Sequence, residues 1–226
     1  MIKAIVTDIE GTTSAIDFVH KTLFPYAAAK LPDFVRANAN TPAVKAVLRE
    51  TAQIANLDTS HTEALIQQLL DWIAEDKKIT PLKTIQGLIW EDGYRQGDYQ
   101  AHMYQDAVTK LKEWHQQGIP LYVYSSGSIH AQKLFFEFSE AGNLLPLFSG
   151  HFDTTTGPKK EAASYQAIQQ ALNIPATDIL FLSDIVEELD AASAAGFQTA
   201  WIQRDQSLIQ KPPHQCLESF SNLDLS

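Results

Sequence analysis

The sequence predicts an α/β protein, with a doubly wound parallel sheet as its core and an all-helical domain inserted after the first strand. Three observations lead to this fold. The second half of the chain alternates strand patterns with helix patterns from Pro120 to about Gln203. A single strand pattern, KAIVTD at residues 3–8, stands at the beginning of the chain. Between these parts, residues 16–97 carry helical patterns and no strand pattern.

The first strand is expected at KAIVTD, because β-branched and apolar residues in a short run are typical of a buried strand. In the segment that follows, Ser60 with Glu63 three residues later predicts a capping box, and apolar residues then recur at helical spacing. Thr80 and Pro81 predict another helix start, since proline fits the first turn of a helix. This part of the chain is therefore expected to be helical.

The core resumes with a helix in AHMYQDAVTKLKEWHQQG, which Gly118 ends. Strands are expected in PLYVYSS, HFD, DILFLSD and QTAWIQ, and helices in IHAQKLFFEFS, KKEAASYQAIQQALN and VEELDAASAAG. We therefore expect residues 1–15 and 98–226 to form the α/β core, and residues 16–97 to form a helical cap. The expected helix 101–118 has one apolar face, made of Ala107, Val108, Leu111 and Trp114.

Composition excludes several classes of protein. With 226 residues and 45% hydrophobic residues, the chain is long and apolar enough to bury a core. The net charge of -10 argues against a nucleic-acid partner, since phosphate backbones require clustered Lys and Arg. No apolar run approaches the roughly 18 residues of a membrane helix, and the first residues do not resemble a secretion signal. One cysteine, Cys216, excludes an internal disulfide, so a cytoplasmic location is expected.

Polar residues follow three of the predicted strands at the point where each strand ends. Asp8 follows the first strand, Ser125 and Ser126 the second, and Asp184 the strand DILFLSD. In an open parallel sheet, ligands bind beyond the carboxyl ends of the strands, so these side chains are expected around one crevice. A lysine at a predicted helix start, Lys159 or Lys160, is expected to join them.

This set of residues has a chemical logic that favours phosphoryl transfer. The Asp8 carboxylate is suited to attack phosphorus as a nucleophile, and Asp8 with Asp184 supplies the hard oxygen ligands that Mg²⁺ prefers. A serine hydroxyl and the amides of the following turn, including Gly127, are suited to bind phosphate oxygens. The lysine would neutralise negative charge. Each residue alone fits an ordinary turn, cap or solvated helix start; their joint occurrence in this order favours the functional interpretation.

The same residues carry a resemblance to a known family. DIEGT resembles the first motif of the haloacid dehalogenase superfamily, usually Asp-x-Asp-x-Thr, and YSSGS, Lys159 and LSDIVEE resemble the second, third and fourth. A closer resemblance is to the enolase-phosphatases of methionine salvage, which have Glu in place of the second acid of DIEGTT. It extends from residue 2 to about residue 203 and includes YSSGSxxAQKLxF, HFDTxxGxKxExxSY, FLxDxxxE and GLIWEDGY.

The resemblance implies a Rossmann-like core with a helical cap, and a role for each motif residue. Asp8 would be the nucleophile, and Glu10 would give a proton to the leaving alcohol and then take one from water. One Mg²⁺ per chain would be held by Asp8, Asp184 and the backbone carbonyl of Glu10. Lys159 would contact the phosphoryl group. The expected site therefore consists of Asp8, Glu10 and Lys159 as catalytic residues, Ser125, Ser126, Gly127 and Lys159 as substrate-binding residues, and Asp8, Glu10 and Asp184 as metal ligands.

The implied reaction begins with 2,3-diketo-5-methylthiopentyl-1-phosphate. This substrate is enolised to a 2-hydroxy-3-keto-pentenyl phosphate and then dephosphorylated to the acireductone 1,2-dihydroxy-3-keto-5-methylthiopentene. Glu10 and Lys159 are the two candidates for the base that removes the carbon proton. Phe18, Phe24 and Trp90 are candidates for an apolar pocket in the cap, although core packing is the more common role for residues of this kind. The resemblance also implies a monomer.

Two features depart from the wider superfamily pattern: Ser183 stands where glycine commonly precedes the fourth-motif acid, and Glu188 stands where aspartate is frequent. Glu188 is therefore open to two interpretations, as a metal ligand or as a hydrogen-bonded neighbour of the ligands. The spacing GxKxE selects Lys159, with Lys160 as the alternative.

The alternative function is a plain Mg²⁺-dependent phosphatase of the same superfamily that acts on another small phosphate ester. A phospho-accepting receiver domain is disfavoured by the long helical insertion. A dehalogenase is disfavoured because it has no use for Glu10 or for a magnesium site.

Overall fold

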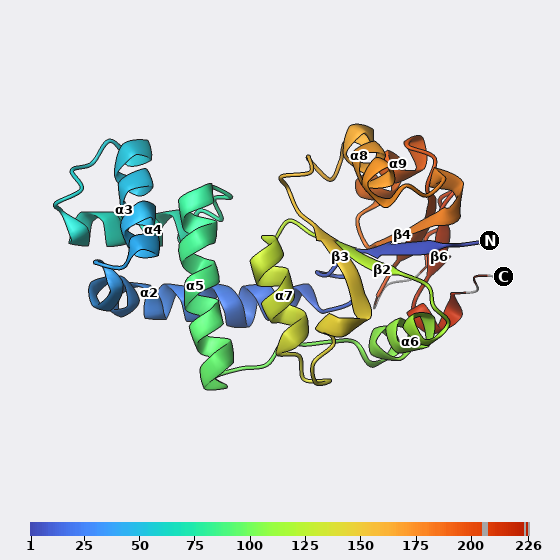
Figure 1. The fold of residues 1–226 in the computed structure, drawn as a ribbon, viewed down its shortest axis with the longest axis horizontal. Helices are drawn as coiled ribbons and strands as arrows, with labels where there is room; N and C mark the ends of the chain where they lie inside the picture. Colours follow the sequence, from blue (N-terminus) through green and yellow to red (C-terminus); the bar gives the residue numbers. More distant parts are fainter. Residues whose placement is uncertain (205–207, 224, 226) are drawn as a thin grey trace. The chain divides into compact units, whose positions relative to one another are not determined.

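The computed structural model describes residues 1–204, 208–223 and 225. The chain divides into two compact units, one formed by Met1–Ile16 with Gln100–Ser226 and the other by Asp17–Tyr99 (Figure 1). The first unit contains the sheet, and the second unit is built of helices. The assignment of residues 16–97 as a functional cap stays a prediction.

In the first unit, the described residues form a six-stranded sheet in the order β3-β2-β1-β4-β5-β6, and every neighbouring pair is parallel. The β1 strand is central and fully buried, as expected for an apolar run covered on both faces. The expected fold class is thereby confirmed, although β6 was not predicted. The strands are β1 (Ala4–Thr7), β2 (Leu121–Tyr124), β3 (Phe148–Phe152), β4 (Ile179–Ser183), β5 (Gln198–Ile202) and β6 (Gln215–Leu217).

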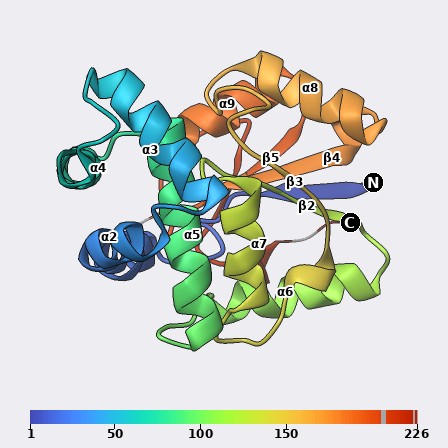
Figure 2. The same ribbon diagram turned by 60° about the vertical axis from the view of Figure 1, so that its left-hand side comes forward.

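Helices cover both faces of this sheet. The chain runs from β1 outward to β2 and β3, then returns to the other side of β1 for β4 and β5. Because crossovers are right-handed, this reversal of direction moves the later helices to the opposite face. Figures 1 and 2 show α8 and α9 on one face and α6 on the opposite face. The helices are α6 (Gln105–Gln116), α7 (Ile129–Glu137), α8 (Ala162–Leu172) and α9 (Val186–Ala194), with single 3-10 turns at Leu145–Leu147, Ala176–Asp178 and Phe220–Asn222.

Most of these elements follow the sequence patterns, with one correction that matters for the site. The four apolar residues predicted for one face of α6 are all buried, and Gly118 has a φ of 77°, which favours glycine. The helix α8 begins at Ala162 rather than at the Lys159–Lys160 pair. A turn precedes this helix, in which the Glu161 amide donates to the Pro158 carbonyl. Both lysines lie in this turn, so the expectation of a lysine at the helix start was wrong.

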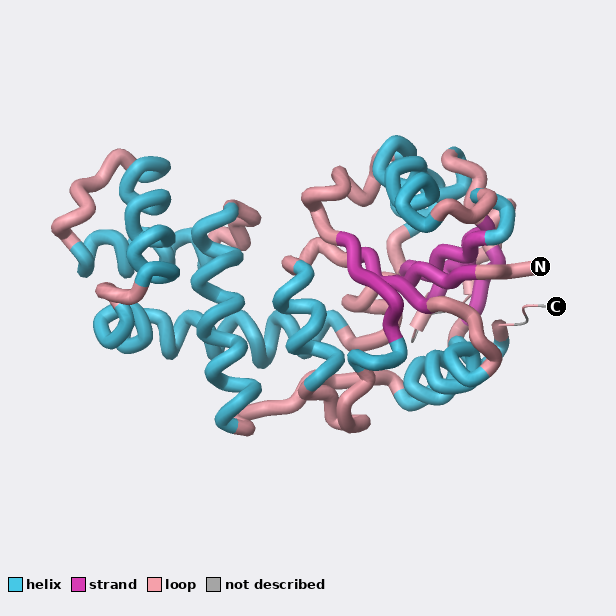
Figure 3. The backbone as a smooth tube through the Cα atoms, viewed as in Figure 1, coloured by secondary structure: helices cyan, strands magenta, loops and turns pink. Residues whose placement is uncertain are grey.

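The second unit is helical throughout: residues 17–99 are all described, and none of them lies in a strand (Figure 3). Its helices pack around a shared core that includes Leu31, Leu65, Leu69, Ile85 and Ile89. No described helix in either unit is long and apolar enough to cross a membrane. The elements are α1 (Ile16–Phe18), a π-helical turn (Val19–Leu23), α2 (Phe24–Asn38), α3 (Pro42–Ala55), α4 (Thr62–Ala74) and α5 (Thr80–Gln96).

The capping box predicted at Ser60 and Glu63 does not form. The helix α4 begins at Thr62, and the position before it is His61, which makes no side-chain capping bond. The Ser60 amide donates to the Asp58 carboxylate at 2.8 Å. Glu63 instead accepts two hydrogen bonds of 2.8 Å from Arg36 of α2. The prediction was wrong because the Glu63 carboxylate forms a bidentate pair with Arg36 of another helix. It is therefore not available for the capping box.

We expect Gly93→Ala to destabilise the helical unit. A Cβ at position 93 would lie 2.7 Å from a ring atom of Tyr99 and 2.8 Å from the Tyr26 ring. Overpacking of this kind costs roughly 1–3 kcal/mol and outweighs the roughly 1 kcal/mol that alanine gains in helix propensity. Urea unfolding should show this loss, whereas Thr84→Ala, at an exposed position of the same helix, should be close to neutral. Equal stability of both variants would contradict the packing argument.

Candidate active site

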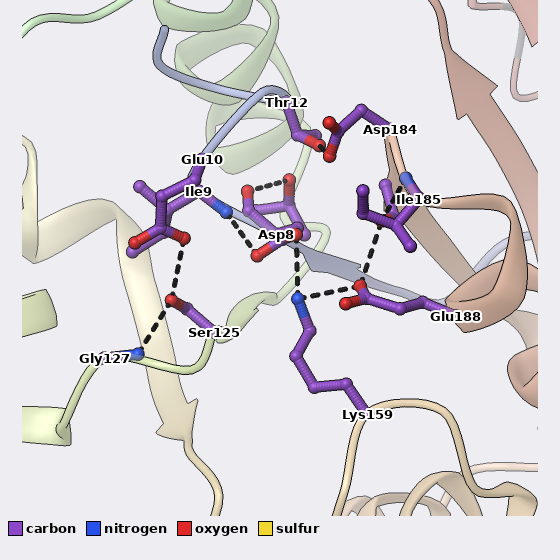
Figure 4. A network of polar contacts seen from close by, with 12 residues as sticks. Asp8, Ile9, Glu10, Thr12, Ser125, Gly127, Lys159, Asp184, Ile185 and Glu188 are labelled. Atoms are coloured by element: carbon purple, nitrogen blue, oxygen red, sulfur yellow. Dashed lines mark hydrogen bonds and ion pairs between the residues drawn. The ribbon is translucent and has the colours of Figure 1, made fainter. Parts of the chain in front are cut away.

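The carboxyl ends of three neighbouring strands bring the predicted site residues together. Asp8 follows β1, Ser125 follows β2, and Asp184 follows β4. Figure 4 shows these side chains around one centre, with Lys159 reaching in from the loop before α8. Asp8 is buried, and its Oδ1 accepts a hydrogen bond from the Ile9 amide at 2.8 Å. The strand-end argument thus correctly predicts that these side chains lie close together, while their role in a reaction stays a prediction.

The loop after Asp8 turns sharply around the carbonyl of Ile9. The amides of Thr12, Thr13 and Ser14 all donate to this carbonyl, at 3.2, 2.9 and 3.0 Å. Gly11 has a φ of 75°, and a Cβ there would overlap the carboxylate of Asp184. Glycine is therefore required twice over, by its backbone conformation and by the close approach of Asp184.

Lys159 links two of the site's carboxylates. Its Nζ lies 2.7 Å from Asp8 Oδ2 and 2.7 Å from Glu188 Oε2. Burial alone would lower the pKa of Lys159, but these carboxylates outweigh it and raise the pKa, so the ammonium keeps its proton. Tyr165 holds the backbone at this position, because its hydroxyl donates to the Lys159 carbonyl at 2.7 Å.

Lys160 occupies a very different place. Its side chain is 62% exposed and lies 4.0 Å from the similarly exposed Glu187. The contact pattern therefore favours Lys159 over Lys160 as the lysine of the site, in agreement with the GxKxE spacing. A charge as exposed as that of Lys160 is screened by water and contributes little.

Glu10 and Ser125 form a second pair in the site. The Ser125 hydroxyl donates to Glu10 Oε2 at 3.0 Å and accepts a hydrogen bond from the Gly127 amide at 3.2 Å. Burial, and then the charge of Asp8, raise the pKa of Glu10 above its ordinary value. The Ser125 hydroxyl is hydrogen-bonded to both Glu10 and the Gly127 amide. Contact of Ser125 and Gly127 with phosphate stays a prediction. Ser126, half-buried between them, also stays a predicted ligand of phosphate.

Glu188 is the residue that sequence reasoning left open. Besides Lys159, it accepts a hydrogen bond from the Ser183 hydroxyl at 3.0 Å. Burial, and then the charge of Asp8, raise its pKa, although the ammonium of Lys159 and the Ser183 hydroxyl oppose this rise. In this structure, Glu188 bonds to the lysine and to the serine that replaces the commoner glycine. These contacts favour the interpretation of Glu188 as a hydrogen-bonded neighbour of the ligands.

Gln132 lies in the AQK segment, residues 131–133, and sequence reasoning did not identify its contacts. Its buried amide nitrogen donates to the carbonyls of Gly127 and Phe152, both at 2.9 Å. It therefore connects the turn after β2 with the end of β3. Its oxygen lies 3.2 Å from Nδ1 of His151. The sequence offers one indication of this role: a polar residue lies on the inner face of a predicted helix directly after the turn. A buried amide is normally hydrogen-bonded, so such a residue is expected to bond to the backbone nearby.

The charges of the site suit a divalent cation. Four carboxylates, those of Asp8, Glu10, Asp184 and Glu188, face the single ammonium of Lys159. Burial, and then the charge of Asp8, raise the pKa of Asp184 to about 6, and Lys159 and the Thr12 hydroxyl oppose this shift only in part. Within the described ranges, no three His, Cys, Asp or Glu side chains are arranged to hold a metal by themselves. The donor set fits Mg²⁺, which takes one or two carboxylates and completes its shell with other oxygens.

The aromatic residues suggested for a substrate pocket lie in the helical unit. The rings of Phe24 and Trp90 stack with centroids 6.3 Å apart and planes 10° apart, and Phe18 contacts the edge of Tyr99. The Trp90 Nε1 donates to the Leu23 carbonyl at 2.9 Å. All three candidates are half-buried. Their contacts explain them as packing residues, and binding of the methylthio group by them stays a prediction.

A parallel sheet whose strand ends gather two acids, a serine and a buried lysine is typical of a hydrolase that transfers phosphoryl groups through an aspartate. Residues 2–196 match the family of haloacid dehalogenase-like hydrolases, whose members generally use Mg²⁺. The crystal structure of CbbY from Rhodobacter sphaeroides in complex with phosphate has the same fold, with a TM-score of 0.60 at 16% identity over 98% of this chain and 96% of that one.

Much closer relatives specify the family further. Enolase-phosphatase E1 of Pseudomonas syringae pv. syringae is 56% identical over 223 residues, which is 99% of this chain and 97% of that protein. The corresponding protein of Alcanivorax borkumensis is 52% identical over the full length of both chains. The crystal structure of the UTR4 protein from Saccharomyces cerevisiae gives a TM-score of 0.84 at 33% identity, over 99% of this chain and 100% of that one. The chain belongs to the enolase-phosphatase family of haloacid dehalogenase-like hydrolases.

Proposed function

We propose that this chain catalyses the acireductone-forming step of methionine salvage. It isomerises 2,3-diketo-5-methylthiopentyl-1-phosphate to the 2-hydroxy-3-keto-pentenyl phosphate. It then adds water across the phosphate ester, giving 1,2-dihydroxy-3-keto-5-methylthiopentene and phosphate. The similarity to enolase-phosphatases over nearly the whole chain supports this reaction. The observation that carries it is the pairing of two unlike acids, Asp8 and Glu10, in one buried site.

The two acids are suited to different roles. Asp8 lies 2.7 Å from the ammonium of Lys159, which holds the carboxylate in place as a nucleophile toward phosphorus. Glu10, with its raised pKa, holds a proton more readily than an acid in water. It can donate that proton to the leaving oxygen and then remove one from the water that hydrolyses the aspartyl-phosphate. Such acid–base assistance is worth roughly 10²–10⁴-fold in rate.

Glu10 is also the better of the two candidates for the enolisation base. The ammonium of Lys159 sits between two carboxylates and keeps its proton, so it is a poor base. A carboxylate with a raised pKa is a stronger base than an ordinary one. A proton taken from the substrate carbon by Glu10 would leave this residue in the acid form that phosphoryl transfer requires.

Lys159 and one Mg²⁺ per chain would neutralise the charge of the phosphoryl group. Asp8, Asp184 and the backbone carbonyl of Glu10 are the residues that would hold the ion, and Ser125, Ser126 and Gly127 would bind phosphate oxygens. When bound, the ion supplies Lewis-acid polarisation of the substrate's oxygens. The Tyr165 hydroxyl donates to the Lys159 carbonyl and so fixes the backbone of this residue. The ammonium of Lys159 thereby stays next to the Asp8 carboxylate.

The helical unit, residues 16–97, would act as the cap over the core formed by residues 1–15 and 98–226. In this proposal the cap supplies the apolar surface for the methylthio group, with Phe18, Phe24 and Trp90 as its candidates. The half-buried state of these aromatic side chains supports them as candidates. The family resemblance supports a monomer, and the single cysteine supports a cytoplasmic location. The net charge of -10 argues against a nucleic-acid partner, and no described helix is long and apolar enough to cross a membrane.

The deciding experiment follows the diketo phosphate by absorbance and by phosphate release at the same time. An enolase-phosphatase should show formation of the enol phosphate before or together with release of phosphate. Generic phosphate monoesters should be hydrolysed far more slowly. If generic esters are hydrolysed as fast and the diketo substrate is not enolised, the chain is a plain Mg²⁺-dependent phosphatase instead.

Removal of Mg²⁺ is expected to abolish both half-reactions. The four carboxylates around Lys159 leave the site too negative for an anionic substrate without a further cation. After treatment with EDTA, activity should fall to background, and added Mg²⁺ should restore it while Ca²⁺, which prefers a larger and more flexible shell, should restore it poorly. Full activity in metal-free buffer would contradict the proposed metal site.

A further inference from the structure

Two carbonyls of the loop that carries Asp8 and Glu10 accept hydrogen bonds from outside the loop. The Thr13 carbonyl accepts a hydrogen bond from the Tyr104 amide at 3.0 Å. The Thr12 carbonyl accepts one from Nε of Arg204 at 3.0 Å, across 192 positions of sequence. The loop is therefore supported from outside by two distant parts of the first unit.

Arg204 is itself held in a rigid setting. Its Nη1 lies 3.0 and 3.1 Å from the two oxygens of Asp106, at the start of α6. Its guanidinium lies over the ring of Tyr104, 3.8 Å from the centroid, and 5.5 Å from the centroid of Phe220. Only 11% of the side chain is exposed. The planar guanidinium is fixed in one orientation by stacking and by hydrogen bonds from two of its nitrogens. The ammonium of a lysine cannot make this set of contacts.

The same carboxylate also holds the C-terminal segment. Asp106 Oδ2 accepts hydrogen bonds from the Ser219 hydroxyl at 2.7 Å and from the Phe220 amide at 2.8 Å. Asp106 therefore connects Ser219 and Phe220 to Arg204, and Arg204 connects them to the Thr12 carbonyl. The hydroxyl of Thr12 donates to Asp184 Oδ1 at 3.3 Å, so the chain of contacts ends at a predicted ligand of Mg²⁺.

We propose that Arg204 is a positioning residue of the active site: by fixing the Thr12 carbonyl, it sets the place of the Thr12 hydroxyl and of Asp184. The inference rests on the proposed function, because it gives Asp184 a role in that reaction. Arg204 touches neither of the two acids that act on the substrate. It acts through the backbone of the loop that carries them.

The test compares Arg204→Lys with the matched control Ser219→Ala. The lysine variant keeps the charge but cannot bond to both the Thr12 carbonyl and the two oxygens of Asp106. The control removes one hydrogen bond to the same carboxylate and leaves the contact with Thr12 intact. We expect Arg204→Lys to lower kcat about 10- to 100-fold with KM within about twofold, because misplaced catalytic groups lose rate rather than binding. Ser219→Ala should lower the melting temperature and keep kcat within about twofold of wild type.

A second readout is independent of turnover. Calorimetric titration with Mg²⁺ alone should show several-fold weaker binding in Arg204→Lys and unchanged binding in Ser219→Ala. If Arg204→Lys does not fold, Asp106→Asn carries the test, because it weakens the anchor of the guanidinium and should lower kcat and Mg²⁺ affinity in the same direction. Wild-type kcat and Mg²⁺ affinity in the folded variant would overturn the proposal.

The proposed function can fail separately from this inference. Its failure would appear in the wild-type enzyme, which would not enolise the diketo phosphate. In that case the variants would be compared by phosphate release from a generic aryl phosphate. A loss of kcat in Arg204→Lys on that ester would still support the positioning role.

Discussion

Asp8→Asn should abolish phosphate release from the diketo phosphate while leaving exchange of its acidic carbon proton measurable. Phosphoryl transfer needs the carboxylate as a nucleophile, and loss of a nucleophile in a preorganised site lowers kcat by roughly 10⁴–10⁶-fold. Enolisation needs a bound metal, a base and a polarised ketone, and at high Mg²⁺ it does not need the charge of Asp8. The variant should fold, because Lys159 keeps its contact of 2.7 Å with Glu188.

The measurement is NMR in deuterated water, with phosphate and the carbon proton followed in the same sample. It should be made at high Mg²⁺, since asparagine retains one metal-binding oxygen but loses the charge. Glu10→Gln is the companion variant: it should impair phosphate release and, if Glu10 is the enolisation base, also stop exchange. Phosphate release at a near wild-type rate by Asp8→Asn would show that Asp8 is not the nucleophile.

The second large effect is expected at Lys159. Lys159→Ala should lower phosphate release by at least 10²–10³-fold, about the cost of removing one preorganised donor from a charge-stabilising site. It should also destabilise the fold by roughly 3–5 kcal/mol, since the buried carboxylates of Asp8 and Glu188 would lose their shared counter-charge. Steady-state kinetics and urea unfolding measure the two effects independently.

Lys160→Ala is the matched control for this prediction. The neighbouring side chain carries the same charge but is 62% exposed, so its removal should leave kcat and stability nearly unchanged. The opposite outcome, with activity lost in Lys160→Ala and kept in Lys159→Ala, would show that Lys160 is the lysine of the site.

Much of the fold follows from local patterns in the chain. The alternation of apolar runs with amphipathic segments from Pro120 onward is sufficient to predict a parallel sheet, because parallel strands need helical crossovers. The predicted inner face of α6 is the buried face in the structure. The short strand Gln215–Leu217 was missed because a three-residue edge strand has too few residues to show a period. The capping box failed because Arg36, 27 positions away, binds Glu63.

The site divides in the same way. The sequence by itself determined which acids, serines and lysines gather at one edge of the sheet, because the carboxyl ends of parallel strands must face the same side. Only the tertiary structure decided what each of them contacts: Lys159 rather than Lys160 between two carboxylates, Glu188 on Ser183, and Arg204 on the Thr12 carbonyl. The contacts of Lys159 with Asp8 and of Arg204 with Thr12 join residues far apart in the sequence, and no local period encodes them. The raised pKa values of Glu10 and Asp184 likewise depend on burial and on charges brought close by folding. The order of residues therefore predicts where these side chains gather, whereas their pKa values depend on the tertiary structure.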